Sequence, residues 1–131
     1  MKKLTSIVLI SILLVSCLVA LMVAGCTTTR DKYLTIMSVS NQTSDSFSMD
    51  YDSFDGVKHY KIRLKQEATI SMTFTTTEGT LDCAILDHSN STTVYEALAV
   101  PTSTDTVTLP KGTYVVRFTG DHHRGGWAFT W

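Results

Sequence analysis

Hydrophobic and polar side chains alternate with a period of two along most of the chain beyond residue 41. Short runs that contain glycine, proline, asparagine or aspartate interrupt this alternation at close intervals. Such a pattern is typical of strands that have one buried and one solvated face. Beyond the first 25 residues, no window has a sustained helical period. The chain is therefore predicted to fold almost entirely as β-sheet.

The alternation predicts about eight strands after residue 41, preceded by a weaker strand over residues 33–40. The eight cover residues 46–52, 57–65, 68–75, 81–87, 92–100, 107–109, 114–119 and 127–131. Asp55-Gly56 is predicted to close a hairpin, Glu78-Gly79 to form a second turn, and residues 120–126 to form a loop. Reversals at this spacing predict an antiparallel two-sheet sandwich.

The predicted hairpin brings two polar faces of opposite charge together. Asp50 and Asp52 lie on the solvated face of one strand, and Lys61 and Arg63 lie on the solvated face of the next. Opposite charges on neighbouring strands contribute about a few tenths of a kcal/mol. We therefore expect these faces to pair.

The first 26 residues have a different pattern. Lys2 and Lys3 precede an almost unbroken apolar run over residues 4–24, which predicts an N-terminal signal helix for export. The closing residues 23–26, Val-Ala-Gly-Cys, resemble the lipobox of bacterial lipoproteins, in which diacylglycerol is attached to the cysteine and the chain is cut before it. This resemblance implies cleavage between Gly25 and Cys26 and lipidation of Cys26.

The predicted organisation is a signal peptide over residues 1–25, a polar tether over 26–32 and a β domain over 33–131. Two alternatives stay open. Cleavage before Cys17 is the first, although it leaves an apolar segment at the start of the mature chain. An uncleaved anchor is the second, since roughly 20 apolar residues suffice to cross a bilayer. All three place the β domain on the outer side of the cell membrane.

Charge excludes one class of partner. The whole chain has 11 basic and 12 acidic side chains, and removal of the leader with Lys2 and Lys3 leaves a formal charge of −3. No basic patch emerges, so nucleic acid is not expected as a partner. About 100 residues remain, which is one domain with a modest core. Lipidation of Cys26 leaves Cys83 without a disulfide partner, so stability must come from packing.

A family resemblance covers residues 47–131. Its motifs are residues 51–56 (Tyr-Asp-Ser-Phe-Asp-Gly), 111–114 (Lys-Gly-Thr-Tyr) and 126–131 (Gly-Trp-Ala-Phe-Thr-Trp), together with Phe47, Gly120 and the strand over 81–87. They resemble a small β-sandwich module of secreted and lipid-anchored Gram-positive proteins, and more distantly the pre-peptidase C-terminal domains. This resemblance implies a jelly-roll-like sandwich with an accessory or adhesive role and no reaction. No functional residue is carried over from it.

Two acidic or histidine-rich segments are weighed as metal sites. Asp50, Asp52 and Asp55 lack the spacing of a calcium loop, and Lys61 stands where the closing acid is needed. In residues 121–123, Asp-His-His, the adjacent histidines of an extended backbone point apart, whereas a closed metal site needs converging ligands. We predict solvated side chains at both places, with no metal and no cofactor.

Enzymatic chemistry is not expected either. Cys83 alternates with Leu81 and Ile85, and an apolar environment of this kind raises a thiol pKa and makes it inert. Trp127 and Phe129 are predicted to lie in the core, whereas Trp131 is as well placed for binding as for packing. The candidate ligand-binding residues, most of them in the loops over 88–92 and 120–126, are Trp131, Trp127, His88, Asp121, His122 and His123.

The favoured hypothesis is a lipid-anchored surface module that binds a protein, an envelope polymer or a carbohydrate. Its alternative is a small metal-dependent surface enzyme or metal-binding factor that uses the aspartates and histidines of these loops. A third hypothesis is a spacer that has no specific ligand.

Overall fold

The computed structural model describes residues 31–88 and 92–131, which contain seven strands and no helix. Their bounds are β1 (Lys32–Ile36), β2 (Val39–Gln42), β3 (Ser46–Leu64), β4 (Ala68–Asp87), β5 (Thr93–Ala97), β6 (Ser103–Leu109) and β7 (Gly112–Thr130). The prediction of an antiparallel all-β fold is confirmed. Nothing in the described residues is a helix long and apolar enough to cross a bilayer. The leader, including Gly25, Cys26 and Cys17, lies outside the described residues.

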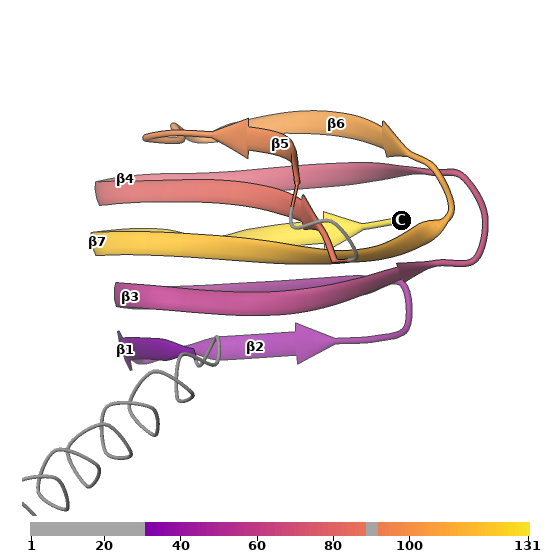
Figure 1. Cartoon of the computed structure of the whole chain (residues 1–131). Helices are drawn as coiled ribbons and strands as arrows, with labels where there is room; N and C mark the ends of the chain where they lie inside the picture. Colours follow the sequence, from indigo (N-terminus) through magenta and orange to yellow (C-terminus); the bar gives the residue numbers. More distant parts are fainter. Residues whose placement is uncertain (1–30, 89–91) are drawn as a thin grey trace, which may run out of the picture. The chain divides into compact units, whose positions relative to one another are not determined.

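Three long strands form the centre of a single seven-stranded sheet (Figure 1). β7 lies between β3 and β4 and pairs antiparallel with both along almost its whole length. At one half of these strands β2 adds to β3 and β6 adds to β4. At the other half β1 adds to β3 and β5 adds to β4. Each half of the sheet is therefore five strands wide.

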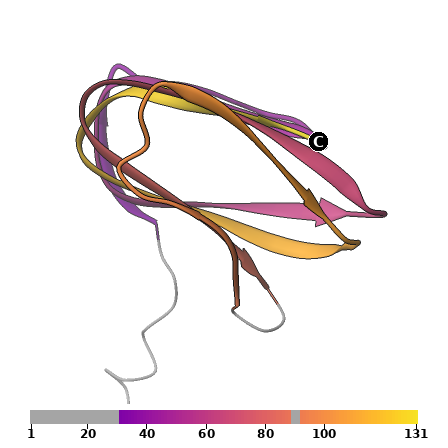
Figure 2. The same cartoon turned by 90° about the horizontal axis from the view of Figure 1, so that it is seen from above.

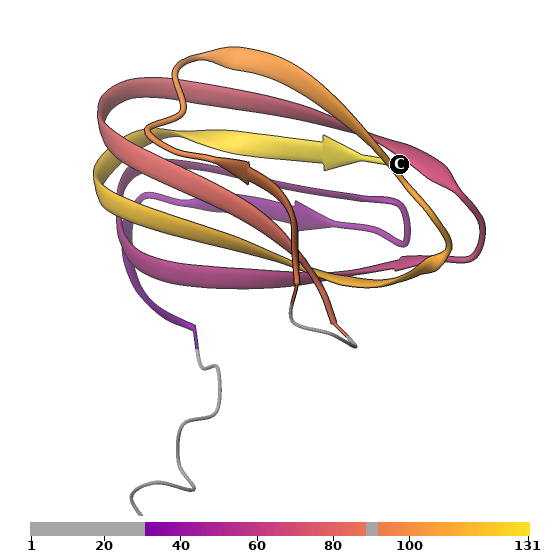
Figure 3. The same cartoon turned by 45° about the horizontal axis from the view of Figure 1, so that its top comes forward.

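The three long strands bend together near their middles and fold the sheet over on itself (Figure 2). The bends coincide with shifts in register, after Tyr51 in β3 and after Thr76 in β4, where the pairing with β7 is interrupted. Bulges of this kind increase bending and twist without ending a strand. The two layers seen in Figure 3 are consequently halves of one sheet, and the predicted two separate sheets are wrong.

Glycine makes the bends sterically accessible. Gly56, Gly79 and Gly125 have φ of 113°, 72° and 139°, values that other residues rarely adopt. A Cβ at Gly125 would collide with the carbonyl oxygen of Thr75 on β4. The residues that predict reversals are thus real sites of strong curvature. The hairpin at residues 53–56, the turn at 78–80 and the loop at 120–126 are wrong predictions, because each segment lies inside a continuous strand.

The continuity of β3 also overturns the predicted charge pairing. Asp50 pairs with Gly126 of β7 and with Val39 of β2, whereas Lys61 pairs with Val115 of β7. The acidic and basic faces therefore lie in different layers. Among the described residues, Asp52 instead approaches Arg124 at 3.9 Å, and both side chains are more than half exposed. A pair this open adds little to stability.

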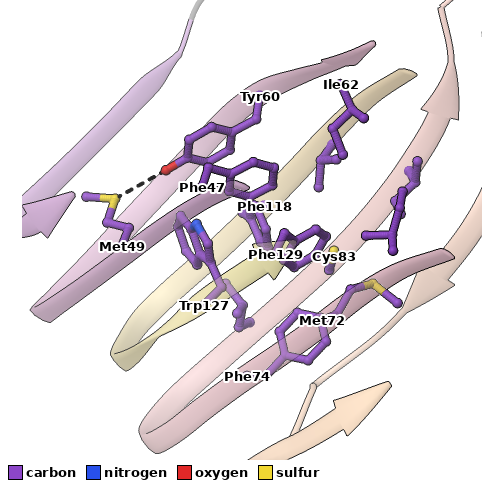
Figure 4. Close-up of a cluster of buried hydrophobic side chains, with 14 of the residues drawn as sticks. Phe47, Met49, Tyr60, Ile62, Met72, Phe74, Cys83, Phe118, Trp127 and Phe129 are labelled. Carbon is purple, nitrogen blue, oxygen red and sulfur yellow. Dashed lines mark hydrogen bonds between the residues drawn. The ribbon is translucent and has the colours of Figure 1, made fainter. Parts of the chain in front are cut away.

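The core fills the space between the two layers (Figure 4). Trp127 from one half of β7 stacks on Phe118 from the other half, with ring centroids 3.9 Å apart. Phe47 and Tyr60, from the two halves of β3, stack at 4.0 Å. Aromatic pairs of this kind contribute roughly 0.5–1.5 kcal/mol beyond their buried area. The prediction that Trp127 and Phe129 belong to the core is confirmed, since both are 2% exposed or less.

Candidate functional site

A groove at the open end of the folded sheet is lined by a half-buried aromatic ring. It lies where β3 ends, β4 begins and β7 ends, and it encloses about 300 Å³. Its lining residues are Ser44, Arg63, Leu64, Lys65, Gln66, Ala68 and Trp131. Leu64 forms the buried floor, and the polar lining residues are exposed. We call this feature the Trp131 groove.

Trp131 is held in place rather than free at the surface. Its backbone N–H donates to the carbonyl oxygen of Asp45 at 3.0 Å, and its ring lies 5.9 Å from that of Phe47. One side of the indole therefore packs on the core while the residue stays half-buried. An amphipathic ring fixed in this way offers a rigid apolar surface to a ligand at low entropic cost.

Two cations line the same groove as this ring. Arg63 and Lys65 both extend from the exposed face at the end of β3. Guanidinium binds carboxylate or phosphate through paired hydrogen bonds, and ammonium acts as a point charge. With the amide of Gln66 and the hydroxyl of Ser44, the groove can stack a sugar or other flat ring and hold an acidic group beside it.

Sequence patterns identified Trp131 but missed the rest of this groove. Residues 63–68 reach Trp131 only because β3 and β4 both pair with β7, a contact across more than sixty positions of sequence. A local signal exists in the alternating basic residues Lys61, Arg63 and Lys65, of which the sequence pattern predicts that Lys61 and Arg63 pair with aspartates. The failure of that pairing leaves these cations available for a ligand.

Asp121 and His122 do come together with another acidic residue. Their ligand atoms and a carboxylate oxygen of Asp55 all lie within 4.8 Å of one another at the bend. The backbone N–H of His122 donates to Asp55 Oδ1 at 2.7 Å, and its Nδ1 lies 2.6 Å from Asp121 Oδ1. That hydrogen bond, with the two negative charges, raises the pKa of His122. Asp121 and His122 are nevertheless highly exposed, which suits solvated side chains.

The predicted location of His123 is wrong. It was expected in a solvated loop, yet it is completely buried in β7. His122 has a φ of 47°, and the two side chains diverge: one is exposed and the other is part of the interior. The expectation that adjacent histidines point apart is confirmed. His123 cannot contribute to a surface metal site in this conformation.

Hydrogen bonds determine the tautomer of His123. Thr76 Oγ1 donates to the carbonyl oxygen of Val100 at 2.7 Å, so its oxygen is left to accept from Nε2–H of His123 at 2.8 Å. Nδ1 then accepts from the hydroxyl of Tyr51 at 2.5 Å. Burial lowers the pKa of His123 and raises that of Tyr51, which keeps the ring neutral and the phenol protonated.

The remaining candidates divide between core and surface. Cys83 is 1% exposed, and burial raises its pKa to about 12, as predicted for an inert thiol. Trp127 is likewise enclosed, and its Nε1–H has no hydrogen-bond acceptor in the described part of the chain. His88 is exposed, and its backbone N–H donates to the carbonyl oxygen of Thr113 at 3.0 Å. Residues 89–91 of that loop lie outside the described residues.

No protein-family model matches the sequence, and a search of curated proteins finds no match. Some solved structures are similar. A pre-peptidase C-terminal domain of collagenase from Bacillus anthracis has 10% identity and a TM-score of 0.49, covering 73% of this chain and 88% of that one. The periplasmic inhibitor of g-type lysozyme from Aeromonas hydrophila has 11% identity and a TM-score of 0.45, covering 71% and 84%.

A carbohydrate-binding module of a Cellvibrio mixtus lichenase, solved with cellotriose, has 12% identity and a TM-score of 0.39, covering 81% of this chain and 86% of that one. The chain is thus distantly similar in structure to a pre-peptidase C-terminal domain and to other β modules. Similarity this low assigns neither a family nor a ligand.

Proposed function

We propose that this chain is an exported lipoprotein whose β domain is a non-catalytic binding module at the outer face of the cell membrane. The ligand is a carbohydrate or envelope polymer that carries acidic groups. The observation that carries this proposal is the Trp131 groove, in which a half-buried indole lies beside Arg63 and Lys65. Without the leader the chain has a net charge of −3, so the domain as a whole does not attract an acidic ligand. The attraction comes from this local pair of cations.

A non-catalytic role agrees with the state of the most reactive side chains. The thiol of Cys83 is buried with a raised pKa, and both ring nitrogens of His123 are occupied by hydrogen bonds. A nucleophile or base must reach its substrate within hydrogen-bond distance. Neither of these two groups meets that condition.

Binding at the groove is tested by titrating acidic and neutral oligosaccharides into the soluble domain by calorimetry. Trp131→Ala is expected to weaken binding of the acidic ligand about tenfold or more, which is typical of loss of a central aromatic contact. Arg63→Ala should weaken acidic but not neutral ligands. Arg124→Ala removes an exposed cation at the bend and serves as the matched control. Equal affinities in all four proteins would refute the groove as the binding site.

Anchoring rests on the lipobox-like residues 23–26 and is tested separately. Cells that express the full chain are labelled with a fatty-acid probe, and the membrane fraction is collected. Cys26→Ala should abolish labelling and maturation, whereas Cys17→Ala should leave both intact. The reverse result would assign lipidation to Cys17. Labelling that survives both substitutions would refute a lipid anchor in the leader.

The cluster of Asp55, Asp121 and His122 favours a second candidate function, a divalent-cation-binding factor. Carboxylate and imidazole ligands suit zinc, although a closed zinc site requires a fourth ligand. Elemental analysis of protein purified without chelators decides the matter. Stoichiometric zinc or calcium that disappears in His122→Ala, but remains in His88→Ala, would establish this function.

A further inference from the structure

Exposed apolar side chains concentrate in one short segment of the domain. Five of the seven exposed large hydrophobic residues in the described part of the chain lie within residues 33–39. Leu34 is 70% exposed, Ile36 55%, Met37 80% and Val39 73%. Apolar residues scattered singly over a surface need no explanation, but a contiguous group marks an interaction site. We call these four residues the β1–β2 patch.

The pairing register places most of the patch on one face. Leu34 pairs with Asp55, Ile36 with Ser53 and Val39 with Asp50, all on the side of β3 that faces away from the core. These three side chains therefore point outward along the same edge of the sheet. β1 and β2 have β3 as their strand partner, and the described residues provide no strand beyond them. The patch is an unpartnered border of the domain.

The shape of this edge disfavours pairing with another strand. β1 has five residues and β2 has four, and Met37, which separates them, has a φ of 49°. A short, kinked edge is a poor template for adding a strand from a second chain. A partner that covers the patch must therefore bind through the apolar side chains rather than the backbone.

The length of the chain between Cys26 and the patch puts the membrane within reach. Leu34, the first residue of the patch, is eight positions after Cys26, and an extended chain spans at most 3.3–3.6 Å per residue, or about 29 Å. With lipid on Cys26, the patch begins within about 29 Å of the acyl chains, whereas the headgroup layer is only some 5–8 Å thick. The anchor holds the patch within reach of the membrane surface at all times.

We propose that the β1–β2 patch rests on the lipid bilayer at the boundary of headgroups and acyl chains. This inference depends on the anchoring at Cys26 proposed above. Tyr33 is adjacent to Leu34 in β1 but points to the opposite face of the strand, where its ring lies 5.8 Å from that of Phe54. The Lys58 ammonium lies 4.5 Å from the centre of the Tyr33 ring and donates to its hydroxyl at 3.1 Å. Amphipathic aromatic rings and long cationic side chains are favoured at membrane interfaces.

Contact along this edge keeps the binding groove available. Figure 1 shows β1 near the bends of the long strands and the C-terminus at the opposite end of the domain. The Trp131 groove belongs to that opposite end. The patch thus gives the anchored domain a fixed orientation with its ligand site exposed beside the membrane.

The test uses the mature lipidated protein, which begins at Cys26, reconstituted in phosphatidylcholine and phosphatidylglycerol vesicles, with a nitroxide at Met37→Cys. Leu98→Cys, at a residue 67% exposed after β5, provides the matched control. Val39→Cys provides a second label within the patch. Cys83 stays unlabelled under native conditions because it is buried. Oxygen concentrates in hydrocarbon, whereas a water-soluble nickel chelate is excluded from it.

The ratio of oxygen to chelate accessibility at residues 37 and 39 is expected to exceed that at residue 98 by on the order of tenfold. Vesicle flotation of the unlabelled protein reports the anchor independently. Protein that floats but shows equal ratios at the three residues overturns the membrane contact and leaves the anchor intact. Dipolar broadening between labels on separate chains also overturns it, because it would identify a second copy on the patch. Protein found unattached to membranes overturns both proposals.

Discussion

The hydroxyl of Tyr51 supports a buried histidine, and its removal should measurably destabilise the domain. Tyr51 is 5% exposed and its hydroxyl is the donor to Nδ1 of His123. Tyr51→Phe keeps the ring contacts with Phe54 and Trp127 and deletes one oxygen. The substitution therefore changes the hydrogen bonding of His123 with little change in packing.

The size of the stability loss follows from which polar atoms of His123 lack a hydrogen-bond partner in Tyr51→Phe. If Nε2–H continues to donate to Thr76, then Nδ1 is a buried acceptor with no donor. If the ring adopts the other tautomer, Nδ1–H is a buried donor with no acceptor, and Thr76 must abandon the carbonyl oxygen of Val100 to donate to Nε2. Either state has an unsatisfied polar atom, which costs about 1–3 kcal/mol. That is a large part of a typical stability of about 5–15 kcal/mol.

Urea unfolding of the soluble domain at pH 7.5, followed by tryptophan fluorescence, measures this loss. Tyr114→Phe is the matched control, because its hydroxyl donates to the carbonyl oxygen of the exposed Pro110 at 2.7 Å in a hydrogen bond that is only partly buried. We expect the control to lose only about 0.5–1.5 kcal/mol. The melting temperature of Tyr51→Phe should fall by roughly 4–8 °C for each kcal/mol.

A Tyr51→Phe protein as stable as the wild type would refute the conclusion that Nδ1 of His123 depends on the Tyr51 hydroxyl for its hydrogen bond. Equal losses of unfolding free energy in Tyr51→Phe and Tyr114→Phe would show that the burial of His123 Nδ1 adds nothing to the cost of removing its donor. A change in the slope of unfolding against urea would indicate that the substitution altered the compactness of a state, so that the comparison has to rest on melting temperatures.

Three further predictions concern pH, the bends and the thiol. Burial lowers the pKa of His123, so as the pH falls the unfolded state binds a proton before the folded state does. The free energy of unfolding should therefore be constant above pH 6.5 and decrease below it. The decrease between pH 7.5 and 5.5 should be at most about 1.4 kcal/mol. Urea titrations in a His122→Ala background measure this, since the raised pKa of His122 acts in the opposite direction. Gly125→Ala should cost about 1–3 kcal/mol through its φ of 139°. Gly112→Ala should cost less than about 1 kcal/mol, because its Cβ would make only ordinary contact with the Tyr114 ring at 3.5 Å. Thermal melts of equal midpoint would contradict the first claim. Cys83 should react with maleimide only as fast as the domain opens, and rapid labelling of native protein would show that the thiol is accessible.

Alternation predicted the strands well because burial on one face is a local property of an extended chain. Tyr60, Ile62 and Leu64 alternate with polar residues in the predicted strand over 57–65, and all three are buried. The two layers followed from the same pattern, since a sheet with one apolar face must cover it. The alternation of apolar and polar residues does not indicate which strand pairs with which.

The bends escaped prediction because a turn and a bulge use the same residues. Buried positions in β3 are odd-numbered up to Tyr51 and even-numbered from Phe54 to Leu64, which is the effect of an extra residue inside one strand. β4 and β7 change parity in the same way, from Phe74 to Leu81 and from Phe118 to Trp127. Locally this pattern fits two strands joined by a turn equally well. Only pairing with β7 across both halves distinguishes the two, and pairing depends on residues distant in sequence.

The candidate site was predicted in part for the same reason. Trp131 was identified from its ring alone, while its partners in the groove come from the junction of β3 and β4. His123 was misplaced because a segment with three glycines nearby and two adjacent histidines has the composition of a loop. Its burial is a consequence of the bend, where β7 passes between β3 and β4 and encloses the ring.

The central strand of the sheet is the last of the seven to be synthesised. β3 and β4 each hydrogen-bond to β7 and not to one another, so neither layer has its middle until residues 112–130 have left the ribosome. Long-range pairing of this kind forms late in folding. A nascent chain that has not reached β7 therefore holds no closed core between the two layers.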